Sequence, residues 1–255
     1  MGLKLQEVKD DDEFGPLIAA FREGFSDPDS PLCRLFMGDW RPHDEAAREA
    51  ALQESTARLR AWHRADPTST WLKVVDEETG EIAAGGKWCI HEKGRNPYDK
   101  VEKVEATWFP EGESREVATM LMNDFLGSAA KNVNRPHVCE FVKSGVLLLN
   151  AKRFLTMTVL NILFTVKKHR RRGAASLIMD WGMERAERLG LDVYIEATPL
   201  GRILYEKYGL EVIEHRRFEV DESRLPPVRD PELRREVVRQ LTPFEWWCML
   251  RRAEV

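Results

Sequence analysis

Cysteine and histidine are scarce in this chain, and neither residue type is clustered. No C-x-x-C pair occurs among the four cysteines, which are Cys33, Cys89, Cys139 and Cys248. This spacing predicts neither a zinc site nor a disulfide framework. The six histidines form no H-x-x-x-H or H-E-x-x-H pattern, so no metal site is expected. A reducing intracellular compartment is therefore the default expectation.

The sequence also lacks a long apolar run and a large excess of charge of one sign. No hydrophobic signal region is present at the first residues, 1–8, and charged or amide side chains interrupt the apolar run at 146–149. The net charge is −4 over 255 residues, which argues against broad nucleic-acid binding. We expect a cytoplasmic protein, with a nuclear location left open, and neither a membrane nor a nucleic-acid partner.

The most informative stretch is an apolar strand, a basic turn and a helix in succession. The strand covers 159–166, basic side chains fill 167–172, and after Gly173 the apolar residues recur at helical spacing. This arrangement brings free main-chain N–H groups and the positive end of a helix dipole to one point, which suits phosphate or pyrophosphate. A solvated turn or a local nucleic-acid contact are the alternative interpretations of the basic residues.

Two segments in this region resemble those of a known family. Arg170-Arg-Arg-Gly-Ala-Ala175 is similar to the R/Q-x-x-G-x-G/A signature of the GNAT-type acyl-CoA N-acyltransferases. The segment 194–210 looks like that family's fifth strand and the helix after it, and the chain resembles small fungal proteins of this type. Lys167 stands where proline is frequent, and Ala175 where glycine is common.

The resemblance implies an α/β (α+β) fold with a mixed, mostly antiparallel central sheet of about seven strands flanked by helices. It also implies splayed fourth and fifth strands, one domain over 1–255, and an acyl-CoA-binding core at 159–220. Alternating apolar residues independently predict a hairpin over 71–90, in which Gly85 and Gly86 mark a bulge or a close backbone approach. Apolar periodicity predicts helices over 14–25, 43–64 and 113–131.

The same resemblance assigns the cofactor to main-chain groups. Phe164, Thr165 and Val166 would pair with the pantetheine amides, as a peptide strand pairs with a sheet edge. The Val166 N–H would also hold the oxyanion of the reaction intermediate. The pyrophosphate would rest on N–H groups from the turn and the helix start, namely those of Arg171, Arg172, Gly173, Ala174, Ala175 and Ser176.

For the reaction, the family pattern implies transfer of an acetyl group from acetyl-CoA, the co-substrate, to a small-molecule or peptide amine without a metal. Tyr205 matches the family tyrosine that protonates the departing thiolate, and Tyr208 is a nearby competitor. Glu196 is the first candidate for the base that deprotonates the amine, and a buried structural carboxylate is its alternative role. A non-catalytic acyl-CoA-binding or regulatory module is the alternative function. The oligomeric state is not predicted.

The segment 139–158 has two interpretations. It is either an additional hairpin beside the fourth strand or a translated intron. The second follows because Cys139-Glu140-Phe141 can be encoded by TGT GAG TTC, which contains a GTGAGT donor site, and removal of the segment restores an unbroken apolar strand. An insertion that disrupts that strand would make the chain inactive.

Overall fold

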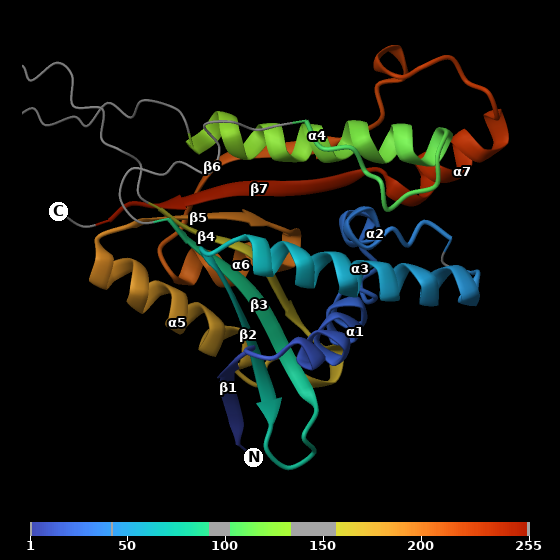
Figure 1. Ribbon diagram of the computed structural model, residues 1–255. Helices are drawn as coiled ribbons and strands as arrows, with labels where there is room; N and C mark the ends of the chain where they lie inside the picture. Colours follow the sequence, from blue (N-terminus) through green and yellow to red (C-terminus); the bar gives the residue numbers. More distant parts are fainter. Residues whose placement is uncertain (1, 42, 92–102, 134–156, 254–255) are drawn as a thin grey trace, which may run out of the picture.

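The centre of the computed structural model, which describes residues 2–41, 43–91, 103–133 and 157–253, is one seven-stranded sheet (Figure 1). Its strands are, in spatial order, β1 (Leu3–Glu7), β2 (Ser69–Asp76), β3 (Ile82–His91), β4 (Met157–Thr165), β5 (Asp192–Ala197), β7 (Phe244–Arg251) and β6 (Glu211–Phe218). Among the described strands, β4 and β5 pair in parallel and every other neighbouring pair is antiparallel. The expected mixed, mostly antiparallel sheet is confirmed.

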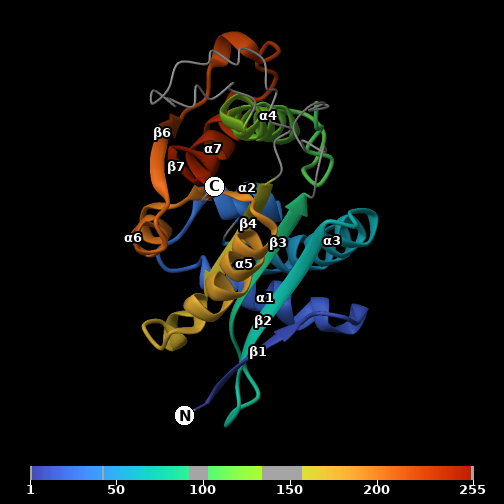
Figure 2. The same ribbon diagram turned by 90° about the vertical axis from the view of Figure 1, so that its left-hand side faces the viewer.

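Helices cover both faces of this sheet (Figures 1 and 2). On one face, α5 (Ala174–Leu189) and α6 (Pro199–Lys207) share a buried cluster with β2, β3, β4 and β5. On the other face, α1 (Phe14–Gly24), α2 (Pro31–Met37) and α3 (Glu45–Ala65) pack on the β2–β4 half. There α4 (Glu113–Val133) and α7 (Pro231–Leu241) pack on the β5–β7 half. Helix α2 joins these two helical groups, since its Leu35 packs in the α4–α7 cluster.

Two glycine positions set how closely the layers approach. A Cβ at Gly85 would lie 2.6 Å from a ring carbon of Phe164, and one at Gly86 would lie 2.9 Å from the carbonyl oxygen of Ile162. The close backbone approach predicted for these glycines is confirmed. On the opposite face a Cβ at Gly182 would lie 2.2 Å from the ring of Trp88, so α5 rests directly on β3.

Helix α7 was not predicted from the sequence, although its signals are present. The Asp230 side chain accepts hydrogen bonds from the N–H groups of Glu232 and Leu233, and Pro231 takes the first helical position, where proline is favoured. Leu233, Val237 and Leu241 then recur every four residues. The proline-rich sequence over 225–231 predicts a surface linker, and this exposed connection leads into the helix.

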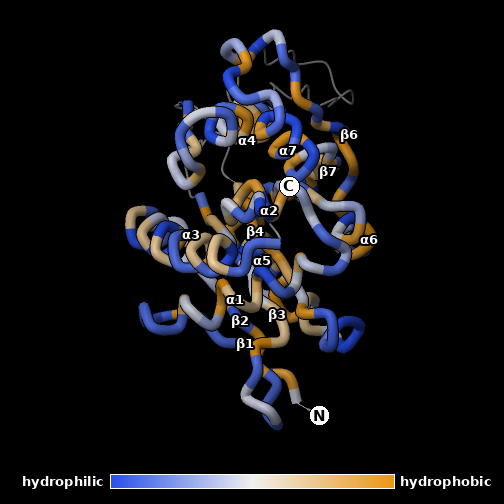
Figure 3. Tube along the Cα trace, turned by 90° about the vertical axis from the view of Figure 1, so that its right-hand side faces the viewer, coloured by the Kyte–Doolittle hydropathy of each residue, from blue (hydrophilic) through white to orange (hydrophobic). Residues whose placement is uncertain are grey.

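The predicted helix over 43–64 forms α3, a surface helix whose tube alternates between hydrophilic and hydrophobic colours (Figure 3). Most of the segment predicted to be a hairpin or a translated intron, 139–156, lies outside the described residues. Met157 and Thr158 at its end are the first residues of β4. Within the described parts, no helix combines the length and the apolar character needed to cross a membrane.

Candidate functional site

Strands β4 and β5 separate halfway along their length. They pair from Met157–Asp192 to Leu160–Ile195, after which β4 continues beside β3 and β5 continues beside β7. The separation begins at Asn161, an unpaired bulge residue between Leu160 and Ile162, which pair with adjacent residues of β3. The predicted splay of the fourth and fifth strands is therefore present, and we call the space between them the strand opening.

The register of β4 determines which main-chain groups face the strand opening. The N–H of Val166 donates to the carbonyl oxygen of Ala83 at 3.0 Å. Because hydrogen-bonded pairs alternate along an antiparallel ladder, Phe164 and Ile162 also turn their N–H and C=O groups toward β3. Leu163 and Thr165 turn theirs toward the opening.

Of the three residues predicted to offer main-chain groups to a ligand, only Thr165 faces the strand opening. Phe164 and Val166 pair with β3, so the Val166 N–H is not free to hold an oxyanion. Leu163, which was not predicted, takes their place. The register shift at Asn161 decides this, and side-chain alternation in the sequence carries no signal of it.

The N-terminus of α5 presents free N–H groups beside this opening. Gly173 is the N-cap, with a φ of 86°, and no side chain caps the helix. The first N–H within α5 to bond a helical carbonyl is that of Leu177, which donates to Gly173 at 3.3 Å. The N–H groups of the predicted residues Ala174, Ala175 and Ser176 therefore remain open to an anion.

The basic turn, residues 167–172, pairs most of its charged side chains with groups of the same chain. Lys168 pairs with Glu81 at 2.7 Å, and Lys167 pairs with Asp27. Arg172 donates from Nη1 to Oδ2 of Asp76 at 2.7 Å and to Nδ1 of the buried His169 at 2.6 Å. The Arg172 guanidinium and the Glu78 N–H hold the pKa of the Asp76 carboxyl below its usual value.

Arg171 is the exception within the turn. Its side chain is exposed and has no ion pair with the described residues, and its φ of 60° is left-handed. That conformation is disfavoured for a residue with a Cβ by roughly 1–2 kcal/mol. The Arg171 side chain is consequently the cation of this turn that stays available to an anionic ligand.

Tyr205 lies on the face of the sheet that carries α5 and α6. The Thr198 side chain caps α6 by accepting from the Gly201 N–H at 3.3 Å, and Pro199 follows at the first helical position. The Tyr205 ring folds back over this first turn, where a Cβ at Gly201 would lie 2.9 Å from it. Burial raises the pKa of the Tyr205 hydroxyl above its usual value.

Tyr208 is already committed to holding α6 against α5. Its hydroxyl donates to Oδ1 of Asp180 at 2.7 Å and lies 3.3 Å from the carbonyl oxygen of Ser176. Among the described residues, the Tyr205 hydroxyl has no hydrogen-bond partner. This contrast favours Tyr205 as the hydroxyl that can meet a ligand.

Glu196 lies on the opposite face, one residue beyond the last β4–β5 pair. Its neighbour Ile195 packs in the α5–α6 cluster, so the Glu196 side chain points toward the other helices, as Tyr194 does. The Tyr194 hydroxyl donates to Oε1 of Glu196 at 3.5 Å. Burial raises the pKa of Glu196 to about 8, against a smaller lowering effect from Tyr194 and Arg216.

The same face is open to solvent at the centre of the sheet. Asn161 is exposed although β4 is the middle strand of the described sheet. The Cys89 thiol donates to Oδ1 of Asn161 at 2.8 Å. Sequence reasoning did not single out Asn161, since its signal is a register shift.

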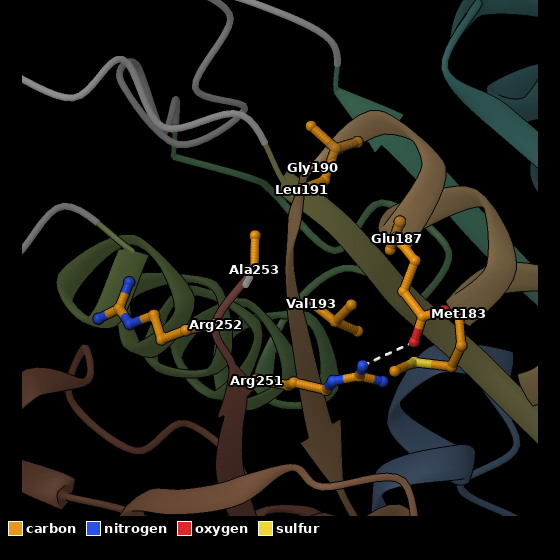
Figure 4. Close-up of a pocket in the computed structure, with 9 residues that line it drawn as sticks. Met183, Glu187, Gly190, Leu191, Val193, Arg251, Arg252 and Ala253 are labelled. Carbon is orange, nitrogen blue, oxygen red and sulfur yellow. Dashed lines mark hydrogen bonds and ion pairs between the residues drawn. The ribbon is translucent and has the colours of Figure 1, made fainter. Parts of the chain in front are cut away.

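A separate cavity of about 300 Å³ lies at the other end of β5 (Figure 4). Its lining includes Met183, Leu191 and Val193, together with an ion pair of 2.6 Å between Arg251 and Glu187. Val193 pairs with Arg251 at the start of β5, whereas the strand opening begins beyond Ile195. The cavity is thus distinct from the site of Tyr205 and Glu196.

No family model matches this chain. One segment of 42 residues, 16% of the chain, is 40% identical to the probable acyltransferase SID5 of Ajellomyces capsulatus. That match spans 31% of the length of SID5, so it concerns a minority of both proteins.

Solved acetyltransferase structures align along almost the whole chain. A polyamine N-acetyltransferase of Drosophila melanogaster has a TM-score of 0.55 at 16% identity, and the alignment covers 98% of this chain and 100% of that one. Arylalkylamine N-acetyltransferase 2 of Aedes aegypti has a TM-score of 0.55 at 14% identity, with both chains fully covered. A structure described as histone acetyltransferase HPA2 and related acetyltransferase, from Corynebacterium glutamicum, has a TM-score of 0.53 at 14% identity and covers 100% of this chain and 98% of its own. The chain therefore has the fold of the GNAT N-acetyltransferases, as its central motifs indicate.

Proposed function

We propose that this chain is an acetyl-CoA-dependent N-acetyltransferase that moves the acetyl group directly from the thioester to an amine. The arrangement of the strand opening supports this most. Glu196 is the candidate base that deprotonates the amine, and Tyr205 is the candidate acid that protonates the thiolate. They lie on opposite faces of the sheet beside that opening. This separation lets the base act on the attacking amine while the acid acts on the departing thiolate.

In this proposal the main chain binds the cofactor. The pantetheine amides pair with Leu163 and Thr165 at the free part of β4, and the pyrophosphate rests on the N–H groups that begin α5. Arg171 adds its charge to the site, because the other basic side chains of the turn are bonded to carboxylates or main-chain carbonyls. The Leu163 N–H replaces that of Val166 as the proposed oxyanion donor.

The proton steps follow from the two side chains. Ionised Glu196 takes a proton from the ammonium form of the acceptor, directly or through water, so that the neutral amine attacks. The tetrahedral intermediate then collapses, the C–S bond breaks, and the Tyr205 hydroxyl gives its proton to the sulfur. The nitrogen releases its remaining extra proton as the amide forms, and that proton, passed through solvent, restores the Tyr205 hydroxyl. We propose a small-molecule or peptide amine as acceptor, reached past Asn161, and a cytoplasmic setting.

The test is calorimetric titration with acetyl-CoA followed by turnover with a panel of amines, detecting free thiol. The panel contains agmatine, a polyamine, an arylalkylamine and a peptide with a free N-terminus, because the solved neighbours include enzymes named for the first three kinds of amine. Binding with turnover is the expected result. Binding without turnover of any amine would favour the non-catalytic acyl-CoA module, and absence of binding would contradict both.

A further inference from the structure

One arginine of the basic turn is bonded to three main-chain carbonyls rather than to a carboxylate. Nη2 of Arg170 donates to the carbonyl oxygen of Gly24 at 2.9 Å and also to that of Asp27, while Nε lies 3.4 Å from the carbonyl oxygen of Thr165. Gly24 ends α1, and Asp27 lies in the connection from α1 to α2, residues 25–30. A single guanidinium thus joins the end of α1 and the α1–α2 connection to the end of β4.

The rest of that connection is held mainly by its own neighbours. Ser26 bonds to the carbonyl oxygen of Glu23 and forms a bridge with Asp29, whose carboxylate pairs with Arg34 of α2. Within the described residues, the polar contacts from 25–29 to segments other than α1 and α2 come from Arg170 and Lys167. Both residues belong to the basic turn.

The residues that follow Arg170 are those on which the pyrophosphate rests in the proposed function. A ligand on the N–H groups of 171–176 restrains the main chain of the turn, and Arg170 extends this restraint to the α1–α2 connection. We propose that Arg170 is a positioning residue that couples an occupied cofactor site to the order of residues 25–30. This inference rests on the proposed function.

The geometry explains why arginine is needed there. Its planar group carries donors in fixed directions, so it can bond carbonyls of two segments while Nε points to a third. Lysine would keep the positive charge but would lack the planar set of several N–H donors in fixed directions. Arg170→Lys therefore tests the bonds while leaving the net charge of the turn unchanged.

The experiment is amide hydrogen exchange of the full chain with and without saturating coenzyme A. In the wild type, we expect coenzyme A to slow exchange both at the start of α5, residues 174–177, and at residues 25–30. In Arg170→Lys, the slowing at 174–177 is retained and that at 25–30 falls at least fivefold. Arg188→Lys is the matched control, because Arg188 is exposed in the last turn of α5, at the end of the helix opposite to the cofactor site; it keeps both effects.

The outcomes separate this inference from the function on which it rests. Slowing at neither segment of the wild type would overturn the proposed function and the inference together. Slowing at 174–177 alone would leave the function standing and overturn the inference, as would an Arg170→Lys variant that behaves like wild type. Should Arg170→Lys not fold, titration of the wild type with coenzyme A replaces it: the slowing at 25–30 and at 174–177 should have the same midpoint, and different midpoints would overturn the coupling.

Discussion

At the scale of single residues, the two proposed catalytic groups differ in how their surroundings set their protonation. Tyr205 is buried without a hydrogen-bond partner among the described residues, and burial raises the pKa of its hydroxyl above the usual value, so the protonated form is favoured. Glu196 is half-buried between the helices and has its pKa raised to about 8, so it changes charge within the working range of most enzymes. The first suits an acid, and the second suits a base.

Tyr205→Phe should lower kcat about 100-fold or more while the affinity for acetyl-CoA changes little, because general-acid assistance contributes roughly 10²–10⁴ in rate. Steady-state kinetics with calorimetric binding checks this. Tyr208→Phe is the control: its hydroxyl bonds to Asp180, so its loss should lower stability by about 1 kcal/mol and leave kcat within a few-fold. Equal effects of the two variants on kcat would argue against Tyr205 as the acid.

Glu196 should make activity depend on pH. Because only the ionised carboxylate accepts a proton, kcat/KM should rise with pH up to about 8 and then level off, and Glu196→Gln should remove this rise. A pH profile of both proteins measures it. A wild-type profile that is flat from pH 6 to 9 would contradict the assignment.

The raised pKa of Glu196 also has a consequence for stability. Between its ordinary pKa of 4.5 and about 8, the folded chain binds a proton that the unfolded chain does not. Stability should therefore fall as pH rises through this window, by up to about 1.4 kcal/mol per pH unit. Denaturant unfolding of Glu196→Gln should lack this contribution. A stability change without a change in the kinetic profile would indicate a structural carboxylate.

At the scale of elements, periodicity in the sequence was sufficient wherever one face of an element is buried. The hairpin, the helices α1, α3 and α4 and the strand β4 follow from alternation or helical spacing because burial imposes those periods. The partners of the basic turn could not be predicted in this way. Arg170 meets Gly24, and Arg172 meets Asp76, across long stretches of chain that only the folded sheet brings together.

The contact between α5 and β3 gives a prediction with a matched control. Gly182→Ala would place a methyl group 2.2 Å from the buried Trp88 ring, so it should destabilise the protein by roughly 1–3 kcal/mol. A Cβ at Gly127 in α4 would have no neighbouring atom within 4 Å, and Gly127→Ala should therefore stabilise the protein by about 0.5–1 kcal/mol. Denaturant unfolding compares the two. Effects of the same sign would show that Trp88 can move aside.

At the scale of the whole molecule, a buried ion-pair network fixes the unpredicted helix α7 to α4. Arg234 and Glu113 are both nearly inaccessible to solvent, and Arg234 also pairs with Glu116 at 3.2 Å and Glu222 at 3.1 Å. The N–H groups of Arg229 and Asp230 donate to Glu113 as well. The network thus holds α7 and α4 together on one face of the β5–β7 half of the sheet.

Arg234→Met should destabilise the chain by roughly 3–5 kcal/mol, because it leaves the Glu113 carboxylate buried without its cation. Thermal or denaturant unfolding would detect this. The double variant Arg234→Met with Glu113→Gln should recover part of the loss, since no unpaired charge then remains. Failure to recover any stability would point to lost packing rather than to the buried charge.

The separation of β4 from β5 leaves an interior strand with the properties of a sheet border. From Asn161 to Thr165, β4 pairs on one side only among the described strands. Half of its peptide groups there have no neighbouring described strand, although β4 is the middle one of the seven. Unpaired borders of this kind recruit foreign strands and promote aggregation. The bond from Arg170 to the Thr165 carbonyl covers one of these groups. A bound coenzyme would cover others. It would then protect the chain against self-association, to which the coenzyme-free chain is more prone, as well as supply its acetyl group.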